Sequence, residues 1–165
     1  TVTRAVLVNE PDRSVRSVPG GSDAYGCITC VDVAPRVRDV EPLAAELARV
    51  LAPGGVLLMT VPNVQFYRVV LAMAHGHWRA VEGGVLDPSH IRFFTAYEAV
   101  ELVRRHGLHV EAILPLMSVP PETVPRDAEG CINSGNIRLG PLKDDEYKVY
   151  LTSQFLVAAT KPSPE

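Results

Sequence analysis

The chain contains 165 residues, of which 47% are hydrophobic and 21% are charged, and its formal net charge is −3 at pH 7. This composition is typical of one globular domain and excludes a disordered chain. Apolar runs such as Val56–Val61 are far shorter than the roughly 20 residues of a membrane span, and the slight acidic excess argues against a nucleic-acid or membrane partner. We therefore expect a single domain over residues 1–161, followed by a tail over residues 162–165.

Two strands and one helix are predicted in the N-terminal part of the chain. The β-branched residues of Val2–Val8 predict a first strand, and Cys27–Val33 predicts a second. Asp39 is a suitable N-cap for a helix that extends to Leu51 and carries apolar residues at helical spacing.

The central part of the chain predicts a buried strand and two further helices. The continuous apolar run Val56–Val61 predicts a strand that is buried on both faces. A helix is predicted from Gln65 to about Ala74. Thr95 and Glu98 form a capping box that begins another helix, and Gly107 ends it.

The C-terminal part of the chain predicts two strands around an irregular segment. Leu108–Met117 predicts one strand, and the Pro/Gly-rich segment from Pro120 to Pro141 predicts an ordered excursion. The alternation of strands and helices indicates an α/β fold with a mostly parallel sheet and helices on its faces. Because no helix is predicted before the last strand, Phe155–Lys161, we expect this strand to be antiparallel at one edge of the sheet.

Three cysteines are too few for a disulfide scaffold and indicate a reducing cytoplasm as the location. Cys27 and Cys30 have C-x-x-C spacing but lie in a predicted strand, where residues three apart face opposite sides. We interpret them as buried structural thiols and predict no metal site. The alternative is a metal or redox site that would need further ligands such as His75 and His77.

Two segments carry a resemblance to a known family. Val50–Asn63, with the sequence VLAPGGVLLMTVPN, resembles the fifth-strand region of class I S-adenosylmethionine-dependent methyltransferases, where a helix ends in R-V-L-x-P-G-G and the strand ends in P-N. Gly83–Thr95, with the sequence GGVLDPSHIRFFT, is similar to the G-x-L-D-x-x-H-x-R-F-F-T segment of one group of these enzymes. That group acts near sugar and natural-product pathways, which implies a small-molecule acceptor.

The resemblance implies a partial Rossmann-like methyltransferase sheet and S-adenosylmethionine as the cofactor. It identifies Cys27–Val33 with the family's fourth strand, whose C-terminal end faces the methionine part of the cofactor, and so places Asp32 and Val33 near it. Asp12, or else Glu10, takes the place of the acidic residue near the adenine.

The chain also departs from the family's pattern. The glycine-rich G-x-G-x-G motif is absent, Gly26 replaces a usual aspartate, and Ala34-Pro35-Arg36 stands where L-E-H often follows. Because the sequence also begins at Thr1, we expect the C-terminal, acceptor-side portion of a methyltransferase. Such a portion would bind S-adenosylmethionine only together with a missing N-terminal segment and would be inactive alone.

A partial sheet has an exposed strand edge, which would favour self-association of the chain.

The alternative to an enzyme is a methyltransferase-like interaction domain that has lost cofactor binding and acts as a docking module.

Methyl transfer to a hydroxyl group needs a base that removes the proton. His90 is the candidate because histidine changes its charge near neutral pH, and Asp87 is a candidate orienter of the His90 ring. The alternative is structural: Asp87 caps a turn, and His90 binds a buried backbone group ahead of the Thr95 helix.

Three further residues are candidates for binding the acceptor. Asn63 ends the buried strand and is expected to point toward the substrate, and Trp78 is a candidate aromatic wall of the pocket. Arg92 is a candidate partner for a carboxylate or phosphate of the substrate. Its alternative role is a local salt bridge with Asp87 or Glu98.

Overall fold

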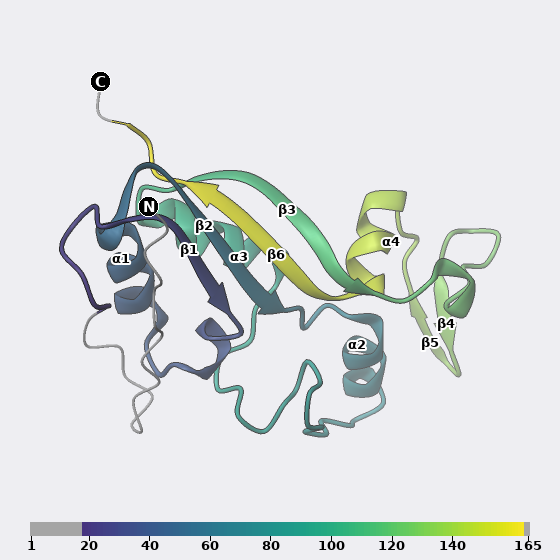
Figure 1. Ribbon diagram of the computed structural model, residues 1–165. Helices are drawn as coiled ribbons and strands as arrows, with labels where there is room; N and C mark the ends of the chain where they lie inside the picture. The colour runs from purple at the N-terminus through teal and green to yellow at the C-terminus, as the bar shows by residue number, and fades with distance from the viewer. Residues whose placement is uncertain (1–17, 164–165) are drawn as a thin grey trace.

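A computed structural model describes residues 18–163 (Figure 1), so the predicted strand at Val2–Val8 and the candidate residue Asp12 lie outside the described residues. The main sheet of the described part has four strands in the order β1-β2-β6-β3. Their bounds are Tyr25–Val31 for β1, Leu51–Pro62 for β2, Thr152–Thr160 for β6 and His109–Ser118 for β3.

Three of the four strands run in the same direction. β1 pairs in parallel with β2, and β6 pairs antiparallel with both β2 and β3. The α/β class, the mostly uniform strand direction and the antiparallel last strand are therefore confirmed. The position of the last strand is different from the one predicted, because β6 lies between β2 and β3 and not at an edge of the described sheet. β3 takes the outer position, and its last five residues are all exposed.

The predicted buried strand is the interior strand β2. Leu57, Met59 and Val61 lie on one face of β2 and are at most 1% exposed. Val56 and Leu58 on the other face are half-buried, so the predicted burial on both faces is confirmed for one face and met only in part on the other. The strand begins earlier than predicted, directly after the preceding helix, at Leu51. The chain can bend there because Gly55 has no side chain: a Cβ atom at this position would lie 2.7 Å from the Ala52 carbonyl oxygen.

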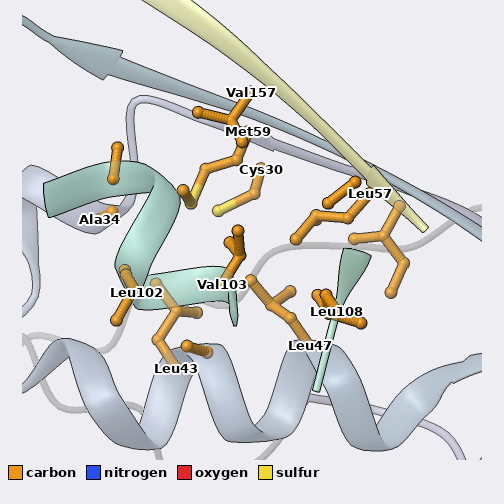
Figure 2. Packing of buried hydrophobic residues seen from close by; sticks show 14 of the residues in the cluster. Cys30, Ala34, Leu43, Leu47, Leu57, Met59, Leu102, Val103, Leu108 and Val157 are labelled. Carbon is orange, nitrogen blue, oxygen red and sulfur yellow. The ribbon is translucent and has the colours of Figure 1, made fainter. Parts of the chain in front are cut away.

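Two helices cover one face of the sheet. α1 (Val40–Val50) begins where the Asp39 carboxylate accepts a hydrogen bond from the Glu41 N–H at 3.3 Å, and α3 (Ala96–Arg105) begins where Thr95 Oγ1 accepts from the Glu98 N–H at 3.1 Å. Both predicted N-caps are confirmed. The second bond of the predicted capping box, from the Thr95 N–H to the Glu98 carboxylate, is not observed among the described residues. Figure 2 shows the side chains that meet between these helices and the strands: Leu43, Leu47, Leu102, Val103, Cys30, Met59 and Val157.

The opposite face of the sheet is apolar and partly open among residues 18–163. Directly paired residues share one face of a sheet, and the row Val31, Thr60, Leu156 and Leu114 crosses all four strands on this face. At its two ends, Val31 is 63% exposed and Leu114 is 49% exposed. No described helix covers these end residues.

The segment between β3 and β6 is an ordered excursion, as predicted. It contains η2 (Pro121–Thr123), the hairpin of β4 (Ile132–Ser134) and β5 (Ile137–Leu139), and the helix α4 (Asp144–Leu151). These elements bury a small second core of Val124, Ile132, Tyr147 and Leu151. The prediction that no helix precedes the last strand was wrong, because α4 leads directly into β6. Its acidic first turn complements the helix dipole, and Tyr147 and Leu151 bury one face.

The two cysteines of the C-x-x-C spacing face opposite sides of β1, as predicted. Cys30 is buried, and burial raises the pKa of its thiol to about 12. Cys27 is exposed, so the interpretation of both residues as buried thiols was wrong for Cys27.

Within residues 18–163, no helix is long and apolar enough to span a membrane.

Candidate functional site

A cavity of about 670 Å³ lies beyond the carboxyl ends of β1 and β2. Asp32, which follows β1, and Pro62, which ends β2, contribute to its wall. The rest comes from Arg36, from Phe66 and α2 (Tyr67–Ala74), from the loop that joins α2 to α3, from the end of β3 and from the start of β6. Open α/β sheets bind ligands beyond the carboxyl ends of their strands, so this cavity is the candidate site.

Asp32 occupies a strained turn at the edge of the cavity. Its φ angle is +54°, in the left-handed region that few residues other than glycine adopt. Its N–H donates to Thr60 Oγ1 at 2.9 Å, and Arg36 Nη2 donates to its carboxylate at 2.5 Å. The turn directs the chain from β1 into η1 (Ala34–Arg36) and fixes the carboxylate at the cavity wall.

His90 presents one ring nitrogen to this carboxylate. Its side chain is buried, and its Nδ1 lies 3.0 Å from the Val85 carbonyl oxygen. A carbonyl oxygen can only accept, so Nδ1 carries the proton and Nε2 has a lone pair when the ring is neutral. Nε2 lies 3.4 Å from Asp32 Oδ1, close enough for an ion pair with a protonated ring. It makes no hydrogen bond within the described part of the chain.

Asp87 shapes the loop that presents His90. Its carboxylate accepts hydrogen bonds from Gly83 N–H at 2.7 Å, from Ser89 N–H at 2.8 Å and from Ser89 Oγ at 2.5 Å. The bonds from Ser89, followed by the one from Gly83, hold the pKa of Asp87 far below its usual range. The prediction that Asp87 orients the His90 ring was wrong, because the Val85 carbonyl binds Nδ1 of that ring.

Asn63 is part of the framework and does not face the cavity. Its side chain is completely buried. Nδ2 donates to the carbonyl oxygens of Val149 and Thr152 at 2.9 and 2.8 Å, and Oδ1 accepts from the Gln65 N–H at 3.0 Å. These bonds tie the end of β2 to the start of β6. The expectation that Asn63 points toward the substrate is therefore corrected: backbone groups use its amide.

Arg92 also has a structural partner. Its Nε donates to the Arg38 carbonyl oxygen at 2.9 Å, and its Nη2 donates to the same oxygen. It forms no ion pair with Asp87 or Glu98 among the described residues, so the predicted local salt bridge is not observed. Arg92 lies outside the cavity wall and connects the loop before α3 to the segment after η1.

Trp78 lies next to the cavity but not in its wall. Its side chain is 53% exposed, and its ring packs edge-on against Phe93 with a centroid distance of 5.4 Å. The adjacent residues His77 and Arg79 do line the cavity. The prediction that Trp78 forms an aromatic wall of the pocket is therefore corrected: its neighbours His77 and Arg79 line the cavity instead.

Of the two predicted cofactor-binding residues that the structure describes, Asp32 lines the cavity and Val33 does not. Val33 packs against the main hydrophobic core, because the turn at Asp32 directs it away from the cavity. Asp12 lies outside the described residues.

Within residues 18–163, no three His, Cys, Asp or Glu side chains gather into a metal-binding group.

Three arginines in the cavity wall were not predicted. Arg36 belongs to η1, Arg68 to α2, and Arg79 to the loop after α2. They come from separate segments and share no motif, so no spacing in the sequence indicates that they meet. Arg36 pairs with Asp32, whereas Arg68 and Arg79 have no carboxylate partner among the described residues.

The family comparison gives one match. The profile of a family described as "Methyltransferase domain" matches residues 4–113, which is more than half of the chain. No curated protein sequence matches at a significant level.

Solved structures of S-adenosylmethionine-dependent methyltransferases share the fold. One from Thermotoga maritima, described as a possible histamine N-methyltransferase, has 17% identity and a TM-score of 0.55, with 88% of this chain and 59% of that chain covered. One from Mesorhizobium loti has 16% identity and a TM-score of 0.52, with 91% and 67% covered. One from Archaeoglobus fulgidus has 10% identity and a TM-score of 0.55, with 85% and 61% covered. The chain thus spans about 60% of the length of these structures.

Proposed function

Because the chain belongs to the class I S-adenosylmethionine-dependent methyltransferase family, we propose that it forms the acceptor side of a site that methylates a hydroxyl group of a small molecule, such as a sugar or a natural product. The observation that carries the proposal is the buried Nε2 atom of His90, which receives no hydrogen bond from any described residue and lies in the cavity wall beside Asp32. The acceptor hydroxyl would supply that donor. Residues 1–161 are proposed to act as one unit in the cytoplasm.

His90 acts as the base in this proposal. The Val85 carbonyl keeps the proton on Nδ1, so the lone pair of Nε2 can accept a hydrogen bond from the acceptor hydroxyl. As the hydroxyl oxygen becomes a nucleophile, its proton moves to Nε2, and the ring becomes positively charged. Asp32 Oδ1, at 3.4 Å, stabilises that charge.

Asp87 has a positioning role in this proposal. Its carboxylate holds the turn through Gly83 and Ser89, and its carbonyl oxygen accepts a hydrogen bond from the His90 N–H at 2.9 Å. The turn therefore sets where the His90 ring enters the cavity wall. The low pKa of Asp87 keeps the carboxylate ionised at neutral pH and the turn intact.

The residues present fit one end of the cofactor. S-adenosylmethionine, when bound, supplies an electrophilic methyl group on a positively charged sulfur. The Asp32 carboxylate, at the carboxyl end of β1, suits the positively charged methionine end. The chain has no G-x-G-x-G motif through which backbone could approach the cofactor closely. We therefore propose that polypeptide in addition to these 165 residues is needed to bind the cofactor.

Substitution of His90 tests the proposed base. In the full-length protein, methyl transfer from labelled S-adenosylmethionine would be measured with glucose, catechol and 4-hydroxybenzoate as trial acceptors. His90→Gln should reduce the rate on the best acceptor by about 10²- to 10⁴-fold, the usual contribution of a general base. His109→Gln, on the exposed start of β3, is the matched control and should retain the rate. An unchanged rate in folded His90→Gln would contradict the proposal.

The docking module remains the second candidate function because of the open face of the sheet. Val31 and Leu114 are large, exposed and apolar, as expected of a surface that another protein covers. Calorimetry separates the two functions. An enzyme should bind S-adenosylmethionine as the full-length protein, whereas a module should show no heat of binding.

A further inference from the structure

We propose that the acceptor carries an anionic group, a carboxylate or a phosphate, which Arg68 and Arg79 bind. The inference rests on the proposed function in one respect, because it takes the cavity at β1 and β2 to be the acceptor site. It adds a substrate class that a hydroxyl-binding base alone does not imply.

The first argument is the balance of charge in the cavity wall. Three arginines and two aspartates line the cavity, although the chain as a whole carries a net charge of −3. Asp32 is paired with Arg36, and the Asp87 carboxylate is held by its own turn. The Asp87 carboxylate has only neutral hydrogen-bond partners, so the wall carries one net positive charge when its histidines are neutral. Neither Arg68 nor Arg79 forms an ion pair with a carboxylate within the described residues.

The second argument is the hydrogen bonding of Arg68. Its Nε donates to Tyr67 Oη at 2.9 Å, and its guanidinium carbon lies 5.8 Å from the centre of the Tyr67 ring. These contacts involve neither of the two terminal nitrogens, which make no hydrogen bond within residues 18–163. A guanidinium with two adjacent free N–H groups fits a carboxylate or phosphate in a bidentate manner.

The third argument is that Arg79 forms no ion pair with any acid among residues 18–163. Glu82 is three residues away along the same loop, but it does not line the cavity and forms no ion pair with Arg79 in the described part of the chain. Among the residues that the structure describes, the carboxylates in the wall are those of Asp32 and Asp87, which have the partners given above. An anionic ligand would give the Arg79 guanidinium a partner of opposite charge.

The apolar part of the wall indicates the chemical character of the rest of the ligand. Phe66, Val69, Leu86 and Met117 line the same cavity, whose volume of about 670 Å³ suits a small organic molecule. The surface supports a ligand with an apolar body and an anionic group. In the proposed reaction, the same ligand also bears the hydroxyl group that faces His90.

Calorimetry with three small probes tests this inference on the full-length protein, without any methyl donor. The probes are 4-hydroxybenzoate, which carries a carboxylate, phenyl phosphate, which carries a phosphate, and methyl 4-hydroxybenzoate, which is neutral. At least one anion should bind about tenfold more tightly than the neutral ester. The anion with the higher affinity identifies the group.

Variants assign the binding to the two arginines. Arg68→Gln and Arg79→Gln should each weaken binding of the preferred anion by about tenfold and leave binding of the ester unchanged. Arg104→Gln is the matched control, because Arg104 is an exposed residue of α3 outside the cavity wall. Three results would overturn the inference. The ester and the anions could bind equally well, neither anion could bind measurably, or the variant that combines Arg68→Gln with Arg79→Gln could keep the anion affinity of the wild type.

The result can be separated from that of the proposed function. Anion binding that depends on both arginines in a protein without methyl transfer would overturn the proposed function alone. Methyl transfer that proceeds equally well on neutral and anionic acceptors would overturn this inference alone.

Discussion

Nε2 of His90 and Oδ1 of Asp32 lie 3.4 Å apart, although 58 residues separate them in the chain. Asp32 is fixed at the carboxyl end of β1 by Thr60 and Arg36, and His90 is fixed in the loop before α3 by the Val85 carbonyl. The pair therefore joins the end of β1 to the loop before α3 at the wall of one cavity. A carboxylate and an imidazole in this arrangement can accept a proton and stabilise the resulting charge.

Asp32→Asn should reduce methyl transfer at saturating cofactor by about 10- to 100-fold, because the amide no longer stabilises a charged His90 ring. Asparagine tolerates the left-handed conformation at this position, so the fold should be retained. The measurement is kcat of the full-length protein, with Asp145→Asn as an exposed control on α4. A kcat equal to that of the wild type would show that the carboxylate has no such role.

Asn63→Leu should lower the free energy of unfolding by about 2–4 kcal/mol. The substitution keeps the branched shape of the side chain but leaves the backbone groups of Val149, Thr152 and Gln65 without their partner, and leaving buried polar groups unpaired costs about 1–3 kcal/mol where the group cannot reach water. Urea denaturation measures the change, and Asn136→Ala, at an exposed position, is the control. If stability is unchanged while acceptor binding is lost, Asn63 is a binding residue after all.

The turn at Asp87 should make stability depend on pH in the acid range. The carboxyl pKa of Asp87 is lowered in the folded state by its bonds to Ser89 and Gly83, whereas an unfolded Asp titrates near about 3.9. Its contribution to stability is thus fully present well above that value and is lost as the pH falls below about 4. Unfolding free energies at several acid pH values should fall less steeply for Asp87→Asn than for the wild type. An identical pH dependence would count against this role.

The three cysteines should differ in reactivity. Cys27 is exposed, whereas burial raises the thiol pKa of Cys30 to about 12 and also raises that of Cys131. Iodoacetamide at pH 8 should therefore modify Cys27 first and should reach the other two only on unfolding. Mass spectrometry of the modified peptides measures the order, and Cys27→Ser is the control. Equal rates for Cys27 and Cys30 in the folded protein would contradict the burial of Cys30.

Local signals in the sequence predicted much of the fold. The caps at Asp39 and Thr95 depend on residues only two or three positions away, so they can be recognised without knowledge of the tertiary structure. The apolar run Val56–Val61 likewise predicts an interior strand from its own residues. The resemblance to methyltransferase segments singled out His90 in its motif and Asp32 at the end of the predicted strand Cys27–Val33, and both line the cavity.

Features that depend on distant parts of the chain could not be predicted in this way. The position of β6 between β2 and β3 depends on which strands pair, and no residue of β6 reports this locally. Asn63 was expected to face the substrate, but its partners at the end of α4 and the start of β6 follow it by more than 80 residues. Arg68 and Arg79 meet the cavity only because α2 and the loop after it fold over the strand ends.

A crystal structure of the full-length protein with S-adenosylhomocysteine would test the central claim most directly, because that product retains the sulfur from which the methyl group leaves. The account predicts that the sulfur lies at the carboxyl end of β1 and opens into the cavity that Asp32 and His90 line. A product bound away from this cavity, or a cavity filled by other segments of the full-length protein, would contradict the account.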